Sequence, residues 1–119
     1  MRPVRIVVGF PPGGTTDISA RLMGQWLSER LGQSFVVENR PGAGSSIAAE
    51  MVMKAAPDGY TLFPASAANA FNATIYDNLN FNFVRDLAPV AGFLRVPNVM
   101  VVNTSVPAKT VREFIADAK

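Results

Sequence analysis

The 119-residue sequence contains no cysteine and no histidine. The chain can therefore supply neither a thiol nucleophile nor a Cys/His zinc site, and it lacks the histidine of a Ser-His-Asp triad. The absence of cysteine fits a reducing cytosol as well as a periplasm in which no disulfide is needed. We accordingly predict no catalytic residue, no metal site and no cofactor in this chain, and we do not expect an enzyme.

Long apolar runs and clustered charges are also missing. No apolar stretch approaches the roughly 18 residues that a membrane-spanning helix requires. The eleven Lys and Arg residues are spread along the chain and leave a net charge of only +2, so we expect no nucleic-acid partner. The sequence shows no signal peptide, and we interpret Met1 as an artificial start that replaces a removed leader.

The residues that are present favour a compact α/β domain. Hydrophobic residues make up 49% of the chain and charged residues 17%, a composition that argues against a disordered tail. A length of 119 residues is enough for one domain with a single core. The run Val4–Phe10 is rich in β-branched residues and predicts a strand buried on both faces. The segment Pro11–Gly14 ends this strand, and a helix is expected from there to Leu31, with Gly32 at its C-cap.

One face of this first helix is predicted to be buried. Apolar residues recur on it at helical spacing, and we expect the Trp26 side chain to lie in the core. The residues of this predicted face are Ile18, Leu22, Trp26, Leu27 and Leu31.

The strand–loop–helix order then repeats. Further predicted elements are a strand at Ser34–Glu38, a helix at Ser46–Ala56, a strand at Tyr60–Phe63, a small-residue loop at residues 65–70, a loop or short helix at 72–83, strands at Leu87–Phe93 and Asn98–Asn103, and a helix at Thr110–Lys119. Successive strand–helix units predict an α/β fold with a doubly wound, mostly parallel sheet.

Small and hydroxyl-bearing residues collect in the three loops that should follow the carboxyl ends of the strands. Ligands of open parallel sheets bind at this edge, where glycines allow close approach and free N–H groups at helix starts attract anions. We therefore predict a cradle for carboxylate or phosphate oxygens. Its candidate ligand-binding residues are Pro12, Gly13, Gly14, Thr15, Thr16, Asp17, Gly42, Ala43, Gly44, Ser45, Ser66 and Asn69.

Each loop also has a purely structural explanation. The glycine pair after the first strand can simply make a tight turn, and the third loop can be a plain connection. Asp17 can accept N–H bonds at its helix start or hold a water that bridges to a ligand, and Ser45 or Ser46 can act as an N-cap. Arg40 can brace its loop through a salt bridge or contact the ligand directly.

Nucleotide sites and hydrolases use glycine loops as well, but their signatures are missing. Neither glycine loop contains the lysine of a P-loop. Gly9, Gly13 and Gly14 do not have the spacing of a dinucleotide fingerprint, and the chain has no Gly-x-Ser-x-Gly nucleophile elbow.

Four segments carry a resemblance to a known family. They read PVRIVVGFPPGGTTD (residues 3–17), VVENRPGAG (36–44), APDGYTL (56–62) and FVRDLAPV (83–90). Together they resemble the substrate-binding proteins of tripartite tricarboxylate transporters, the Bug-type receptors, over nearly the whole chain. After the third strand these receptors commonly carry a histidine, which this chain lacks.

The resemblance implies a periplasmic receptor with a type II-like solute-binding fold, in which two α/β lobes close over a ligand. Residues 1–119 then correspond to an incomplete N-terminal lobe, with the second lobe absent. The implied ligands are small carboxylates, and the implied partners are the membrane subunits of the transporter. In such receptors the loops matching Pro12–Asp17 and Pro41–Ser46 hold one carboxylate through backbone groups and bridging waters.

Two other functions stay open from the sequence. The chain could be an α/β enzyme domain whose catalytic residues lie outside it, or an interaction module without ligand binding. If it is one lobe of a receptor, we expect weak or undetectable ligand binding by the chain alone. We also expect a homo-oligomer that forms by exchange of the terminal strand or helix.

Overall fold

The computed structural model describes residues 2–118. Three strands, four α-helices and one 3-10 turn follow each other in the order that a parallel α/β domain requires. The elements are β1 (Val4–Val8), α1 (Thr15–Leu31), β2 (Phe35–Asn39), η1 (Ala43–Ser45), α2 (Ser46–Met53), β3 (Thr61–Leu62), α3 (Ala67–Ile75) and α4 (Val111–Asp117).

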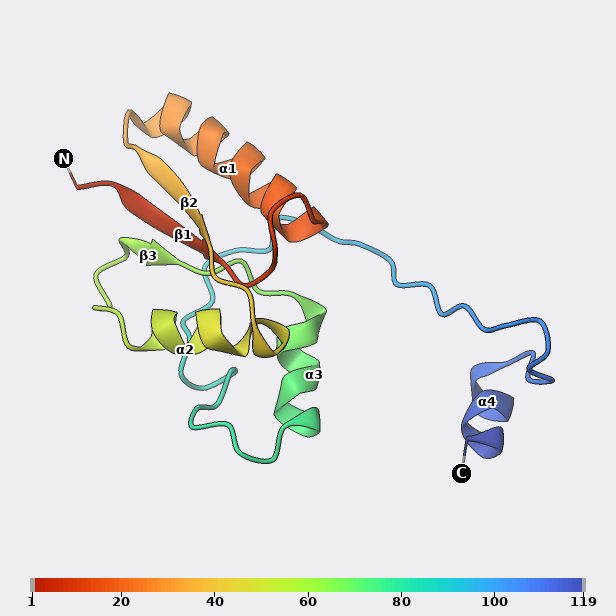
Figure 1. Ribbon diagram of the computed structural model, residues 1–119. Helices are drawn as coiled ribbons and strands as arrows, with labels where there is room; N and C mark the ends of the chain where they lie inside the picture. Colours follow the sequence, from red (N-terminus) through yellow and green to blue (C-terminus); the bar gives the residue numbers. More distant parts are fainter. Residues whose placement is uncertain (1, 119) are drawn as a thin grey trace.

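The three strands form a parallel sheet with β1 in the centre, in the order β2-β1-β3. Ile6 of β1 pairs with Val37 on one side and with Leu62 on the other. The two crossover connections run in opposite directions, so right-handed crossovers must place their helices on opposite faces of the sheet. Figure 1 shows α1 on one face and α2 on the other. The doubly wound α/β fold predicted from the sequence is confirmed.

The core gathers around β1. Val4, Ile6, Val7 and Val8 are all buried, which confirms the prediction of a strand covered on both faces. Ile6, Val8 and Ala20 form the centre of one apolar cluster. The partly buried side chains packed against it are Phe10, Met23, Phe35, Val37 and Leu62.

The buried face predicted for α1 is wrong. Leu22 is 65% exposed, and the residues of α1 that are buried are Asp17, Ala20 and Gly24. A Cβ atom added to Gly24 would lie 3.3 Å from the Ile6 Cδ1 atom, so the helix rests on the sheet through its small residues. Small residues allow the helix backbone to approach the strands closely, and four of the five residues of the predicted face are instead exposed, namely Ile18, Leu22, Trp26 and Leu31.

Trp26 is likewise not a core residue. Its side chain is 53% exposed, and the Arg30 guanidinium lies over its ring at 4.8 Å from the centroid. This cation–π contact covers part of the indole that the sequence pattern assigns to the interior.

Helix ends and short strands differ from the predictions by a few residues. Gly32 is the left-handed C-cap of α1, with φ of 62°, as predicted. In contrast, α2 already ends at Met53, and β3 has only the two residues that pair with β1.

The loop predicted at residues 65–70 is wrong, because α3 begins at Ala67. Ser66 precedes this helix as its N-cap residue, and the Asn69 Oδ1 atom accepts a hydrogen bond from the Ser66 N–H at 2.9 Å. Ala67, Ala68 and Ala70 are good helix formers, and the cap formed by Ser66 and Asn69 starts the helix.

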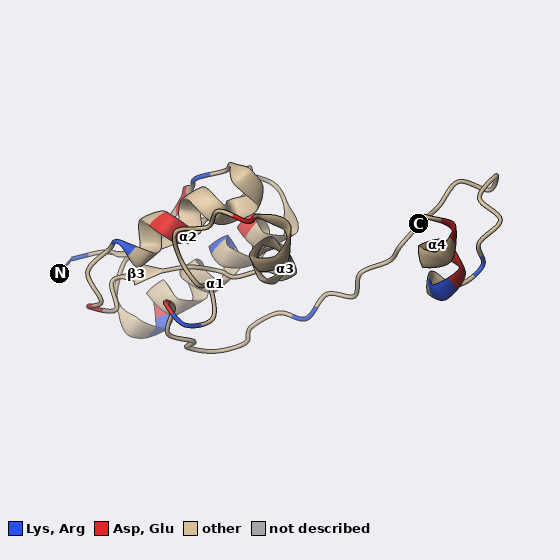
Figure 2. Cartoon of the chain, turned by 90° about the horizontal axis from the view of Figure 1, so that it is seen from below, with Lys and Arg blue, Asp and Glu red and all other residues tan. Residues whose placement is uncertain are grey.

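The strands predicted at Leu87–Phe93 and Asn98–Asn103 are not formed, since within residues 2–118 neither segment pairs with another strand. A strand needs a neighbour that accepts and donates its backbone hydrogen bonds, and these segments run outside the sheet. Figure 2 shows the chain extending away from the α/β core, with α4 standing apart at the far end. The predicted terminal helix is confirmed at Val111–Asp117, capped by Thr110, while its predicted last residue, Lys119, lies outside the described residues.

This extension enlarges the whole molecule. The radius of gyration is 17.3 Å, compared with about 13.5 Å expected for a compact domain of this length. Between residues 2 and 118, none of the helices is both long and apolar enough to cross a membrane.

Candidate functional site

The predicted site residues lie at one end of the molecule. The loops that follow β1, β2 and β3 leave the sheet at its carboxyl edge, where α1, α2 and α3 begin (Figure 1). The chain reverses direction across the sheet between β1 and β3, and such a switch point is where open α/β sheets bind ligands. The fold thus brings the three predicted loops to the same edge.

Asp17 ties down the loop that follows β1. Its carboxylate is 2% exposed and accepts hydrogen bonds from the Gly13 N–H at 2.9 Å, the Asn39 side-chain amide at 2.8 Å and the Arg21 Nε at 3.1 Å. The hydrogen bond from Arg21, followed by those from Gly13 and Asn39, lowers the pKa of Asp17 to about 2. Asp17 is therefore a buried anion held by donors, and its predicted contact with a ligand stays a prediction.

Asn39 belongs to the same network, and sequence reasoning missed it. As the last residue of β2, it donates to the Phe10 carbonyl at 3.0 Å and to Asp17, and its own oxygen accepts from the Arg21 Nη2 at 2.8 Å. A signal was present, since Asn39 is a polar residue at the carboxyl end of a strand directly before a glycine loop.

The loop that follows β2 has an unusual backbone. Gly42, Ala43, Gly44 and Ser45 all have positive φ values, of 139°, 46°, 59° and 75°. For the non-glycine residues Ala43 and Ser45 this conformation costs roughly 1–2 kcal/mol each. Such strain persists only where the surrounding structure holds it in place, and it is frequent at binding sites.

Ser45 is held against the sheet. It is 1% exposed, and a Cβ atom added to Gly9 would lie only 1.8 Å from the Ser45 Oγ atom. Among the side chains of residues 2–118, this Oγ is a buried polar atom with no hydrogen-bond partner. Ser45 therefore packs on the end of β1 rather than capping α2 with its side chain.

Asn72 joins the second loop to α3, and sequence reasoning missed it as well. Its side-chain amide donates to the Gly44 carbonyl at 2.7 Å and to the Ser46 Oγ at 3.0 Å, and the residue is buried. Little in the sequence signals this role, because Asn72 lies in a stretch whose pattern predicts only a loop or short helix.

Ser66 and Asn69 are engaged with each other. The hydroxyl and the N–H of Ser66 both donate to the Asn69 Oδ1, at 3.2 and 2.9 Å, and Asn69 is buried. Both residues are thus used in starting α3, which matches the structural explanation of this loop. A role in ligand binding stays a prediction.

The loop that leads into α1 is exposed. Pro12, Gly13 and Gly14 are exposed, as is Thr15, and in the described chain neither α1 nor α2 receives a side-chain cap on its first-turn N–H groups. The two helix starts thus lack side-chain caps and carry the positive ends of two helix dipoles, although the Ser46 N–H at the start of α2 donates to the Ala43 carbonyl. This arrangement can hold an anion without a cationic side chain.

Arg40 braces its loop from the side. Its Nη2 atom lies 3.7 Å from the Glu38 Oε2 atom, and the Arg5 Nε lies 2.9 Å from the Glu38 Oε1. The hydrogen bond from Arg5 is the main reason why the pKa of Glu38 is lowered. The charge of Arg40 is thus partly compensated, as in the structural explanation of this residue.

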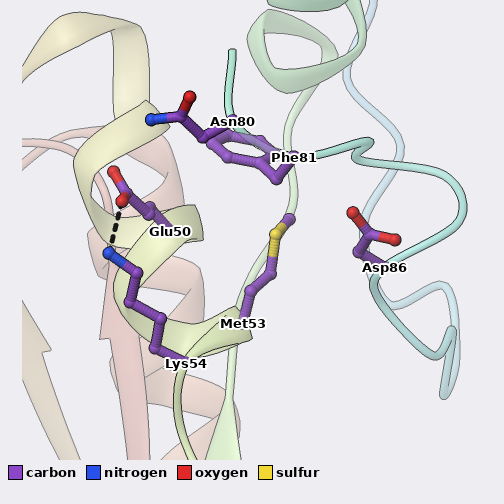
Figure 3. A pocket seen from close by; sticks show the side chains of 6 residues that line it. All are labelled: Glu50, Met53, Lys54, Asn80, Phe81 and Asp86. Carbon is purple, nitrogen blue, oxygen red and sulfur yellow. Dashed lines mark hydrogen bonds and ion pairs between the residues drawn. The ribbon is translucent and has the colours of Figure 1, made fainter.

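A shallow depression of about 320 Å³ lies elsewhere, between α2 and residues 80–86. Figure 3 shows its six lining side chains, with the ion pair between Glu50 and Lys54 on the α2 side. They are Glu50, Met53, Lys54, Asn80, Phe81 and Asp86. None of the predicted site residues lines it, since these residues lie in the loops at the carboxyl edge of the sheet.

Comparison with known proteins decides the family. A family profile described as "Tripartite tricarboxylate transporter family receptor" matches residues 19–119. The chain belongs to this receptor family. Among the curated members, the chain is 38% identical over 120 residues to Protein BugT of Bordetella pertussis, and the match covers 99% of this chain and 37% of BugT.

Solved structures of similar proteins share the fold. The chain is 40% identical to Rpa4515 of R. palustris, solved with adipate, with a TM-score of 0.78 over 98% of this chain and 39% of that one. It is 35% identical to MatC of Rhodopseudomonas palustris, solved with bound malate, with a TM-score of 0.72 over 98% of this chain and 40% of that one. The chain thus spans less than half of the length of the receptors it matches, and its α/β fold is consistent with one lobe of a periplasmic binding protein.

Proposed function

We propose that this chain forms one half of a carboxylate-binding site in a periplasmic receptor that delivers its ligand to a tripartite transporter. The cradle consists of the loop Pro12–Asp17 and the loop Gly42–Ser45, with backbone N–H groups as the anion donors. The membrane subunits of the transporter would be its partners.

The observation that carries the proposal is the pair of uncapped helix starts at one edge of the sheet. The first turns of α1 and α2 lack side-chain caps within the described residues. Hydrogen bonds fix the loops before them, from the Gly13 N–H to Asp17 in the first loop and from Asn72 to the Gly44 carbonyl in the second. Part-buried hydrogen bonds thus hold the loops in place. One of them uses the Gly13 N–H, so the proposed anion donors are the remaining N–H groups at the starts of α1 and α2. The adipate and malate bound to two structurally similar proteins, Rpa4515 and MatC, support a carboxylate as that anion.

The proposed role involves no catalysis. The chain contributes hydrogen-bond donors and dipoles, and the acidic side chain nearest to the cradle, Asp17, is held as a carboxylate with a pKa of about 2. A group with this pKa can neither give nor take a proton near neutral pH.

Affinity should be low for the chain alone. A helix N-terminus contributes about 0.3–1 kcal/mol to anion binding, and up to about 2 kcal/mol when partly buried. Two such termini give at most the roughly 4.1 kcal/mol that corresponds to a millimolar dissociation constant. We expect tighter binding only when a second surface covers the ligand and excludes water.

The test is a chimera in which this chain replaces the matching, 40%-identical segment of the adipate-bound receptor Rpa4515. We expect adipate to raise the melting temperature of the chimera, because a ligand at 100 times its dissociation constant stabilises by about 2.7 kcal/mol. The 119-residue chain by itself should show no shift, or a shift only at millimolar adipate. Adipamide, which has the same shape without charge, is the matched control ligand.

A site variant separates binding from stability. Thr15→Glu adds a negative charge at the first residue of α1, which favours the helix but repels a carboxylate. The variant chimera should fold normally and lose the adipate shift, whereas Thr15→Gln should keep it. An undiminished adipate shift in Thr15→Glu would contradict the proposed site.

A further inference from the structure

Both hydrogens of the Asn39 amide are used to tie the first loop together. One donates to the Phe10 carbonyl at 3.0 Å and the other to the Asp17 Oδ1 at 2.8 Å, while the Asp17 Oδ2 accepts from the Gly13 N–H at 2.9 Å. Asn39 and Asp17 thus connect the two ends of the turn Phe10–Gly13. The turn cannot move without breaking one of these bonds.

The orientation of the Asn39 amide is fixed by its neighbours. Its NH₂ group faces two acceptors, and its oxygen faces the Arg21 guanidinium at 2.8 Å. A rotated amide would place its oxygen against the Phe10 carbonyl and the Asp17 carboxylate, and its hydrogens against a cation. Only one arrangement satisfies all partners.

We propose that Asn39 is a positioning residue, which sets the geometry of the loop backbone from Gly13 to the start of α1 by locking Asp17 to the Phe10 carbonyl. The inference rests on the proposed function, because it assigns this loop to an anion. Asn39 acts through Asp17 and the loop, and it does not contact the ligand.

The charged surroundings of Asn39 are simple. Asp17 and Arg21, both on α1, contact its side chain. The neighbouring charges on the β2 side, Glu38 and Arg40, pair with each other, and Glu38 also pairs with Arg5 of β1. A new charge at position 39 would therefore interact first with Asp17.

The decisive variant is Asn39→Asp, measured through the amide NMR signals of Gly13 and Gly14 in the 119-residue chain. At pH 7 two carboxylates would face each other, which breaks the bonds to Phe10 and Asp17 and raises the pKa of one of the pair. Below this pKa the protonated carboxyl group introduced at position 39 can donate one hydrogen bond again. We therefore expect altered Gly13 and Gly14 signals at pH 7 that return toward those of the parent chain at pH 5.

The parent chain should show no such pH dependence between pH 5 and pH 7, because Asn39 does not titrate. The matched control is Asn103→Asp, since the Asn103 Oδ1 accepts from the Ser105 N–H and hydroxyl at 2.9 Å each, and a carboxylate preserves both bonds. Its Gly13 signals should equal those of the parent at both pH values.

Parent-like Gly13 and Gly14 signals for Asn39→Asp at pH 7 would overturn the positioning role. If this variant is unfolded at pH 7, refolding at pH 5 supports the role and failure to refold overturns it. Arg21→Gln, which alters an exposed side chain, should move the Gly13 signal in the same direction by a smaller amount. An unchanged Gly13 signal in this variant would count against the positioning role of Asn39.

Binding is read separately in the Rpa4515 chimera with adipate. Asn39→Asp should weaken adipate binding at least tenfold at pH 7, with partial recovery at pH 5. If the unsubstituted chimera does not respond to adipate, the proposed function fails, while the Gly13 signals still decide whether Asn39 positions the loop.

Discussion

At the scale of single residues, the candidate site rests on polar side chains that hold its loops. Asp17 and Asn72 are buried and Asn39 is half-buried, and each of the three is hydrogen-bonded to a backbone group of a loop. The sequence pointed to Asp17 because of its place at a helix start. It could not reveal Asn72, because this contact joins residues 28 positions apart and depends on how α3 packs against the second loop.

Asp17 should make folding stability depend on pH. Its pKa is lowered from 3.8 to about 2, so the stabilisation is complete above the unfolded value and is lost as the pH falls from about 4 to 2. Asp17→Asn should lower the melting temperature at pH 7, and the difference from the parent should shrink toward pH 2. Thermal unfolding at a series of pH values measures this, with the exposed Asp77→Asn as control.

Gly9 should tolerate no side chain. An added Cβ would lie 1.8 Å from the Ser45 Oγ and 2.9 Å from the Ser45 Cα, so the strained loop would have to move. We expect Gly9→Ala to cost about 1–3 kcal/mol of unfolding free energy. Gly92→Ala is the matched control, since nothing lies within 4 Å of its Cβ position. Equal urea midpoints for the two variants would contradict the contact.

Ser45→Gly should have the opposite effect. Ser45 has a φ of 75° and a buried hydroxyl without a partner among residues 2–118, and glycine removes both costs. We expect the variant to be at least as stable as the parent in urea denaturation. A loss above about 1 kcal/mol would show that the hydroxyl has a stabilising role.

At the scale of the elements, β1, α1 and α4 were predicted to within a few residues, because their apolar runs and caps are local signals. The buried face of α1 was predicted wrongly, because Ala20 and Gly24 carry no strong apolar signal in the sequence. The periodicity of the large apolar residues predicted that the opposite side of the helix is buried. The strands expected beyond residue 87 failed for a different reason, because pairing requires a neighbour that local sequence does not specify.

The orientation of α1 can be tested with two substitutions of helix-forming residues. Ala20→Leu would place a large side chain between α1 and β1 and should cost about 1–3 kcal/mol. Leu22→Ala removes an exposed side chain and should change the unfolding free energy by less than about 0.5 kcal/mol. If Leu22→Ala lowered the unfolding free energy more than Ala20→Leu in chemical denaturation, the buried face of α1 would be the one predicted from the sequence.

At the scale of the whole molecule, the segment from Val90 to Val102 exposes many apolar side chains, and Val99 and Val101 are more than 80% exposed. Exposed apolar surface of this kind favours association, and unpaired extended segments can be exchanged between copies. We propose that the chain self-associates through this segment. Sedimentation at tens of micromolar protein, a typical working range for such association, should show dimers or larger species.

The variant Val99→Lys/Val101→Lys should shift this equilibrium toward monomer. Val84→Lys, which also alters an exposed valine but lies outside the segment, is the control and should leave association unchanged. A parent chain that is monomeric at all concentrations would contradict self-association.

The central place of β1 has a consequence for the order in which the protein folds. Ile6 must find Val37 and Leu62, so the sheet closes only after two long segments of chain have been brought back to the first strand. Entropy of loop closure makes such distant pairings slow and cooperative. The loops after β1 and β2, which form the proposed anion cradle, can be aligned only once the pairing of Ile6 with Val37 exists, so a carboxylate bound there would report that these two strands have paired.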